Sequence, residues 1–132
     1  MKNDIKIKDR AYEFAIDIVK LVKKLPKDTG GFVLGRQLIK SGTSVGANIE
    51  EATGAFSKND FTYKMNIALK EIRETNYWLR LLRDFDVLPH NTIEGLLEES
   101  VNLRNILSAI VKTSKERREC ASKVKTESFQ NF

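Results

Sequence analysis

Residues 57–85 read SKNDFTYKMNIALKEIRETNYWLRLLRDF, and this stretch decides the fold. Mostly apolar side chains recur in it at steps of three and four residues, the spacing of one face of an α-helix. The members of this stripe are Phe61, Met65, Ala68, Leu69, Ile72, Asn76, Leu79 and Leu82. Ser57 precedes the stripe and can accept a hydrogen bond from an early backbone N–H. The pattern therefore predicts a helix from Ser57 to about Phe85, which Pro89 separates from the next segment.

Three further segments share this helical period, at residues 9–25, 34–52 and 91–114. Residues 27–31 form the connector between the first two, and no alternation typical of strands is present. Short connectors place consecutive helices antiparallel, because a short loop cannot carry the chain back along a full helix. The sequence thus predicts an all-α domain, an antiparallel up-down-up-down four-helix bundle over residues 1–119.

Residues 120–132 are polar and lose the helical period, so we expect a flexible C-terminal tail. Two aromatic residues in this tail, Phe129 and Phe132, could dock on a neighbouring molecule.

Gly42 and Gly46 lie four residues apart in the second predicted helix, next to Ser41, Ser44 and Ala47. Small residues at this spacing allow two helices to approach closely. Since interior glycines destabilise an exposed helix by roughly 1 kcal/mol each, we expect close packing at this face to offset their cost.

A second stripe runs along the 57–85 helix beside the first one. Its apolar members are Ile67, Trp78, Leu81 and Phe85, and Glu71 and Glu74 lie between them. One bundle core cannot bury both stripes, so we expect this second stripe to form a subunit interface. The alternative is that Trp78 covers the edge of its own bundle.

Residues suited to catalysis or metal binding are scarce. His90 is the only histidine and Cys120 the only cysteine, which leaves no His cluster, no Cys cluster and no Cys–His pair. No glycine-rich nucleotide-binding motif is present. Paired carboxylates such as Glu50 and Glu51 are usually solvated or bound to nearby cations. We therefore expect no enzyme activity, no catalytic residues, no metal and no cofactor.

The chain carries 23 Lys and Arg against 18 Asp and Glu, a formal charge of +5 that favours polyanions as partners. The predicted contacts with RNA or DNA are Arg36, Lys40, Lys64, Arg73, Arg80 and Arg83. Tyrosines and a tryptophan lie among them, so the mixture permits phosphate contacts together with base stacking. Local pairing of these cations with nearby acids is the alternative.

Length and composition place the chain in one class of protein. With 132 residues, 41% of them hydrophobic, it has the size of one soluble domain. The beginning of the chain lacks an export signal, and no apolar run approaches the roughly 20 residues that cross a bilayer. We expect a cytoplasmic location and no membrane partner.

Residues 35–52, GRQLIKSGTSVGANIEEA, together with residues 57–79 resemble the four-helix-bundle proteins encoded in intervening sequences of bacterial 23S rRNA genes. That resemblance implies a cytoplasmic up-down bundle that forms ring-like homopentamers with a basic central channel. A similar protein serves diversity-generating retroelements as an accessory factor, binding nucleic acid and a partner reverse transcriptase.

Two functional hypotheses follow. The first is a non-enzymatic homo-oligomer that binds RNA or DNA through phosphates with little sequence specificity. The second is a protein-interaction scaffold that recruits a polypeptide partner.

Overall fold

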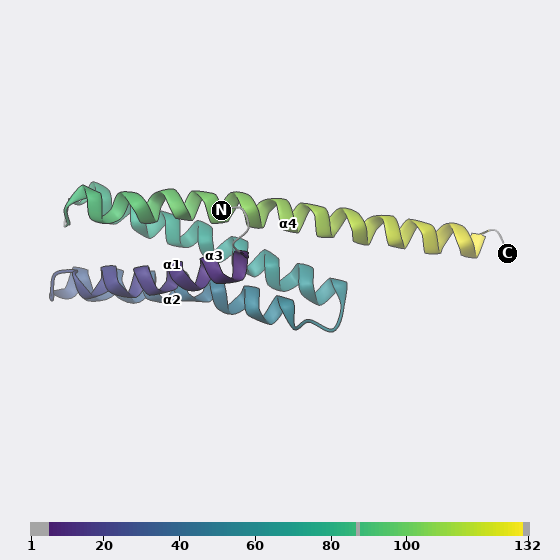
Figure 1. The fold of residues 1–132 in the computed structure, drawn as a ribbon, viewed down its shortest axis with the longest axis horizontal. Coiled ribbons are helices and arrows are strands. Elements are labelled where there is room, and N and C mark those ends of the chain that lie inside the picture. Colours follow the sequence, from purple (N-terminus) through teal and green to yellow (C-terminus); the bar gives the residue numbers. More distant parts are fainter. Residues whose placement is uncertain (1–5, 87, 131–132) are drawn as a thin grey trace.

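The chain reverses direction between each helix and the next, as Figure 1 shows. The computed structural model describes residues 6–86 and 88–130. Its helices are α1 (Ile7–Lys23), α2 (Thr29–Thr53), α3 (Lys58–Asp84) and α4 (His90–Gln130). Those residues contain no strand. The predicted all-α, up-down-up-down bundle is confirmed.

Side-chain caps fix where α2 and α3 begin. The Ser57 hydroxyl accepts a hydrogen bond from the Asp60 N–H at 3.0 Å, which confirms the predicted start of α3. The Asp28 carboxylate accepts a hydrogen bond from the Gly31 N–H at 2.8 Å and starts α2 at Thr29. The prediction that residues 27–31 form a connector is therefore wrong for its last three residues, because the cap stabilises helix despite two glycines.

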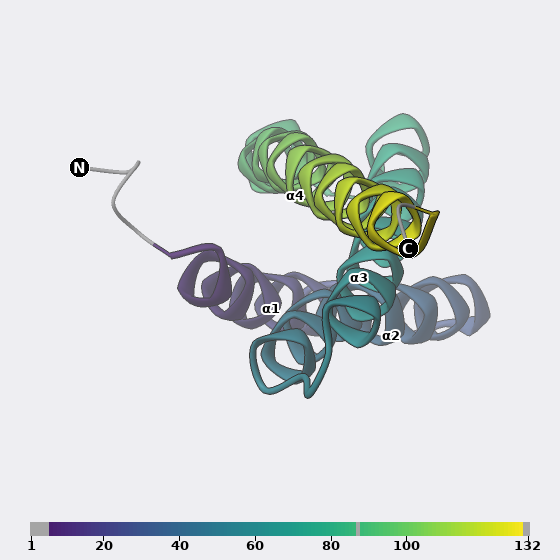
Figure 2. The same ribbon diagram turned by 90° about the vertical axis from the view of Figure 1, so that its right-hand side faces the viewer.

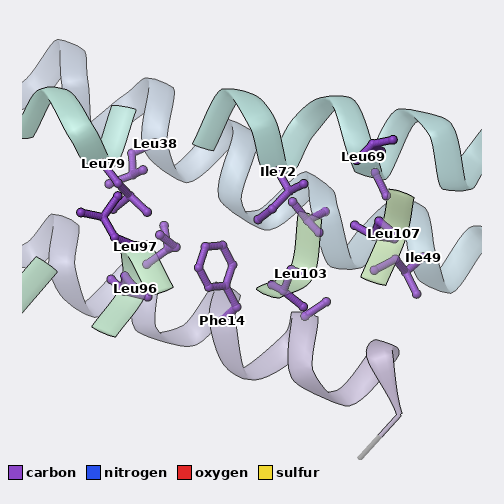
Figure 3. Close-up of a cluster of buried hydrophobic side chains, with 14 of the residues drawn as sticks. Phe14, Leu38, Ile49, Leu69, Ile72, Leu79, Leu96, Leu97, Leu103 and Leu107 are labelled. Atoms are coloured by element: carbon purple, nitrogen blue, oxygen red, sulfur yellow. The ribbon is translucent and has the colours of Figure 1, made fainter. Parts of the chain in front are cut away.

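Helix α3 packs along both α2 and α4, while α1 packs along α2 and more sparsely along α4 (Figure 2). The core between them is aliphatic except for Phe14 of α1 (Figure 3). Ile72 and Leu79 of α3 and Leu103 and Leu107 of α4 are fully enclosed in it. Burial of one such side chain contributes about 1.5–3 kcal/mol, so the predicted stripes hold the helices together.

Three hydrogen bonds to hydroxyl groups connect α3 to its neighbours, one buried in the core and two partly buried. The Thr75 hydroxyl donates to the Ser41 hydroxyl of α2 at 2.9 Å. The Asn76 amide donates to the Ser100 hydroxyl of α4 at 2.8 Å, and the Thr62 and Ser114 hydroxyls also form a hydrogen bond. Since a buried polar group without a partner destabilises the fold, these pairs favour one register of α3 against α2 and α4.

Glycines of α2 let α1 approach closely. A Cβ atom placed on Gly42 would lie 3.0 Å from two carbons of the Ile18 side chain, and one on Gly35 would lie 3.0 Å from Cγ1 of Val22. At Gly46 the nearest atom would be the Ala11 carbonyl oxygen, at 3.5 Å. The expected close packing is confirmed at Gly42, and Gly35 extends the same seam, whereas a Cβ at Gly46 would make only an ordinary van der Waals contact.

Helix α4 continues beyond the ends of the other helices as a single rod (Figure 1). Its residues 120–130 are helical, so the polar composition after residue 119 does not end the helix there. The division into a bundle at residues 1–119 and a tail at 120–132 stays a prediction. The side chain of Phe129 and the whole of Phe132 lie outside the described residues.

Among the described residues, no helix combines the length and the apolar character that a membrane span requires.

The close contact between Gly42 of α2 and Ile18 of α1 leads to a prediction about stability. Gly42→Val should lower the free energy of unfolding by about 1–3 kcal/mol, because two methyl groups would be forced against Ile18. The measurement is urea unfolding followed by circular dichroism.

Gly95→Ala is the matched control. Gly95 is exposed within α4 and no atom lies within 4 Å of a Cβ placed there. Alanine should therefore stabilise this helix by about 0.5–1 kcal/mol. Equal effects of the two substitutions would show that the space at Gly42 is not limiting.

Candidate nucleic-acid interface

The exposed surface of α3 carries a row of cations. Arg73 and Arg80 are exposed and lie seven residues, or about two helical turns, apart on this face. Lys70 is also exposed, three residues before Arg73. Lys70 was not among the predicted contacts, although its spacing from Arg73 would have placed it on the same face.

Two tyrosines interleave with this row. Tyr63 and Tyr77 are 62% and 47% exposed. The Arg80 guanidinium carbon lies 5.8 Å from the centre of the Tyr77 ring, and the Arg80 Nε donates to the Asn76 amide oxygen at 3.0 Å. These contacts hold the Arg80 side chain along the helix with its charge still in water. We call Tyr63, Lys70, Arg73, Tyr77 and Arg80 the α3 face.

Two other predicted cations are partly neutralised by neighbours. The Lys64 ammonium lies 2.8 Å from the Glu51 carboxylate of α2, and this hydrogen bond raises the pKa of Lys64. The Arg83 Nε lies 2.9 Å from the Asp84 carboxylate and lowers the pKa of Asp84. Arg83 also lines a groove of about 380 Å³ beside Glu94 of α4. Lys64 and Arg83 are thus less available to phosphates than Arg73.

Arg36 and Lys40 lie on α2, on a different surface. Both are exposed, one turn apart, and both line a cleft at the hairpin between α1 and α2. The structure therefore separates the six predicted cations: Lys64 and Arg83 form salt bridges, Arg73 and Arg80 are exposed on α3, and this pair lies on α2. Arg80 also lines the groove that contains Arg83, Glu94 and Glu98.

Negative charge gathers at the seam between α1 and α4. A cleft of about 610 Å³ there contains five carboxylates, from Asp9, Glu13, Asp17, Glu98 and Glu99. The Arg10 Nε donates to the Glu99 carboxylate at 3.2 Å, and this hydrogen bond is the main cause of the raised pKa of Arg10. This concentration of negative charge disfavours a polyanion at the seam.

The carboxylates considered for acid–base chemistry sit on helix surfaces. Burial raises the pKa of Glu71, and the nearby Glu74 charge raises it further, while the cations Lys70 and Lys40 act in the opposite direction. His90 begins α4 and its Nε2 lies 3.1 Å from an Asp86 oxygen. Residues 6–86 and 88–130 contain no cluster of three metal-ligating side chains.

The second stripe of α3 is only partly exposed. Trp78 packs against the core of its own chain, as in the alternative reading of the sequence. Its ring stands edge-on to Tyr77 at 5.0 Å, and its buried Nε1 has no acceptor among the described residues. Ile67 and Leu81 are half-buried, whereas Phe85 is 72% exposed. Phe85 is therefore the member of the stripe with the most apolar surface left to cover.

Comparison with known proteins identifies the family. The family model described as 23S rRNA-intervening sequence protein matches residues 3–109. The chain belongs to the 23S rRNA-intervening sequence protein family. A crystal structure of a protein of unknown function, from the S23 ribosomal protein family of Bacteroides thetaiotaomicron VPI-5482, is 43% identical. Its TM-score is 0.76, and the match covers 81% of this chain and 99% of that one. No curated protein matches the chain.

The match to the 23S rRNA-intervening sequence protein family spans α1 to α3 and the first half of α4. All six predicted cations and the whole second stripe lie within it. The extension of α4 after residue 109 lies outside the matched region. The predicted membership and the four-helix architecture are confirmed, while the family description assigns no chemical activity to any residue.

The raised pKa of Glu71 predicts a pH-dependent substitution effect. A carboxyl group with a raised folded-state pKa opposes folding when it is ionised, and this penalty disappears below the ordinary glutamate pKa. Glu71→Gln should therefore raise the free energy of unfolding at about pH 7 and change it little at about pH 3.5. Urea unfolding at both pH values measures the difference.

Glu116→Gln, at an exposed position of α4, serves as the control for the loss of one negative charge. It should change stability little at either pH. If Glu71→Gln stabilised the protein equally at both pH values, burial of the ionised carboxylate would not be the cause.

Proposed function

We propose that the protein is a non-enzymatic helical-bundle protein that binds RNA or DNA through the α3 face, with little sequence specificity. The observation that supports this function best is the exposed row of Lys70, Arg73 and Arg80, interleaved with Tyr63 and Tyr77. Cations neutralise phosphates, and tyrosine rings stack on bases of any sequence. One face supplies both kinds of contact.

The distribution of charge supports the choice of this face. Within the part of the chain that the structure describes, Lys70, Arg73 and Arg80 form no salt bridge, although Glu74 and Asp84 lie on the same helix, while five carboxylates line the α1–α4 seam. A polyanion is steered toward the first surface and away from the second. Flexible cationic side chains on one helix recognise the backbone rather than base edges, so low sequence specificity is expected.

We also propose that copies of the protein associate through the second stripe of α3. Ile67, Leu81 and Phe85 lie beside the α3 face, and Phe85 leaves most of its ring in water. Covering these side chains with a second copy would bury apolar surface and bring several α3 faces together. Such an assembly would strengthen the local positive potential.

Fluorescence anisotropy with labelled single-stranded RNA and DNA tests binding. Affinity should fall steeply with salt, because each neutralised phosphate releases counterions. Arg73→Glu combined with Arg80→Glu should weaken binding at least about tenfold at low salt. The slope of log affinity against log salt should become shallower by about 0.7 for each lost phosphate contact.

Lys8→Glu combined with Lys20→Glu makes the same change in net charge on exposed positions of α1. This control should retain most of the affinity. Equal losses in the two double variants would show that net charge, and not the α3 face, attracts the nucleic acid. Absence of binding at low salt would reject the proposed function.

Light scattering tests the association. The purified protein should have a mass several times the 15.1 kDa of one chain. Phe85→Asp should shift the mass toward one chain without unfolding the helices, because Phe85 is exposed in the subunit. A single-chain mass for the unmodified protein would reject self-association while leaving the binding test unaffected.

A further inference from the structure

A cleft of about 990 Å³ lies where α1 ends and α2 begins. Aliphatic side chains from both sides of the hairpin form its floor, with Val22, Leu25 and Pro26 on one side and Ile39 on the other. Gly35 lies between them, and its missing side chain leaves room for the α1 residues. This hairpin cleft is separate from the α3 face, and Leu25 connects its floor to the core.

Apolar side chains around the hairpin cleft are left in water. Phe32, which lines it, is 62% exposed, and the adjacent Val33 is 55% exposed. Phe32 is absent from the set of side chains packed against the core. Large apolar groups exposed together next to a cleft are typical of a binding surface.

Positive charge borders the same cleft on both sides. Lys23 and Lys27 lie at the end of α1, and Arg36 and Lys40 lie one turn apart on α2. No aspartate or glutamate is among the residues that line the cleft. Within the part of the chain that the structure describes, these four cations form no ion pair. The cleft therefore combines an apolar floor with a cationic rim, and Lys40 of this rim also interacts with the charge of Glu71 on α3.

We propose that the hairpin cleft binds an acidic amphipathic helix of another polypeptide. The rim matches carboxylates and the floor matches aliphatic or aromatic side chains, so charge and polarity are both complementary. A nucleic acid fits this cleft less well, because bases bind by stacking on aromatic rings and the floor is mainly aliphatic. Arg36 and Lys40, predicted to contact nucleic acid, thus contact a polypeptide.

The arrangement of the lining residues defines the partner helix. Phe32, Gly35 and Ile39 follow one another at steps of three and four, along one side of α2. A helix laid in the groove would place its own apolar residues at the same spacing. Its carboxylates would flank that stripe on both sides, facing Lys23 and Lys27 on one side and Arg36 and Lys40 on the other.

A designed probe tests the proposal. It is a fluorescein-labelled helical peptide of about 18 residues, with leucines at steps of three and four and glutamates on both flanks. A scrambled peptide of the same composition has no apolar face and serves as its control. Anisotropy titration with the full chain should show saturable binding of the first peptide and at least about tenfold weaker binding of the second.

Two sets of variants locate the binding. Phe32→Asp, and separately Arg36→Glu with Lys40→Glu, should each weaken peptide binding at least about tenfold. Phe32 is exposed near the start of α2, where an aspartate is compatible with the helix, so the variant should fold. Lys8→Glu with Lys20→Glu and Arg73→Glu with Arg80→Glu should both leave peptide binding unchanged.

Labelled RNA separates this proposal from the proposed function. Phe32→Asp should leave RNA binding intact, whereas the Arg73 and Arg80 variant should weaken it. Failure of the acidic peptide to bind, equal binding of the scrambled peptide, or peptide binding that survives Phe32→Asp would each overturn the proposal. Loss of RNA binding in the Phe32 variant, without peptide binding, would assign the cleft to nucleic acid.

Discussion

Close contact between α1 and α2 is the constraint on which the rest of the structure depends. Gly35 and Gly42 occupy positions where even one methyl group would lie 3.0 Å from Val22 or Ile18. Because α1 packs mainly on α2, this seam positions Phe14 in the core and closes one side of the bundle. The same seam sets the shape of the hairpin cleft, since the end of α1 supplies its floor. The space left by the missing glycine side chains thus lets α1 enclose the core, and it also shapes the hairpin cleft on the surface.

Helix α3 packs against both α2 and α4, and this packing decides which of its side chains are exposed. The hydroxyl contacts of Thr75 to α2 and Asn76 to α4 fix its rotation, so Lys70, Arg73 and Arg80 must face water. Two cationic surfaces result, and they differ in the apolar groups between their charges. The tyrosine rings on α3 can stack on bases, whereas the aliphatic side chains of the hairpin cleft can pack against aliphatic side chains of a partner. The two surfaces therefore differ more in their apolar groups than in their charge.

Periodicity predicts most of the fold, because each core stripe is a property of one helix. The Ser57 cap of α3 was also predictable, since hydroxyl and N–H lie within one turn. The start of α2 was not, because two glycines after Asp28 indicate a turn until the Asp28 cap is seen. Spacing places Arg73 and Arg80 on one face, but it does not reveal that Glu51 of another helix neutralises Lys64. Residue spacing also does not show how much of the Trp78 side chain is covered by its own bundle.

The net charge of +5 is a poor guide to where anions bind, because ion pairs remove charge locally without adding much stability. Exposed pairs such as Arg83 with Asp84 add little stability, so their main effect is to cancel the local field. Arg10 with Glu99 similarly neutralises a cation at the acidic α1–α4 seam. The field that remains comes from cations that form no ion pair among the described residues, such as Arg73 and the four cations of the hairpin cleft. How the helices pack therefore determines which cations stay unpaired and exposed.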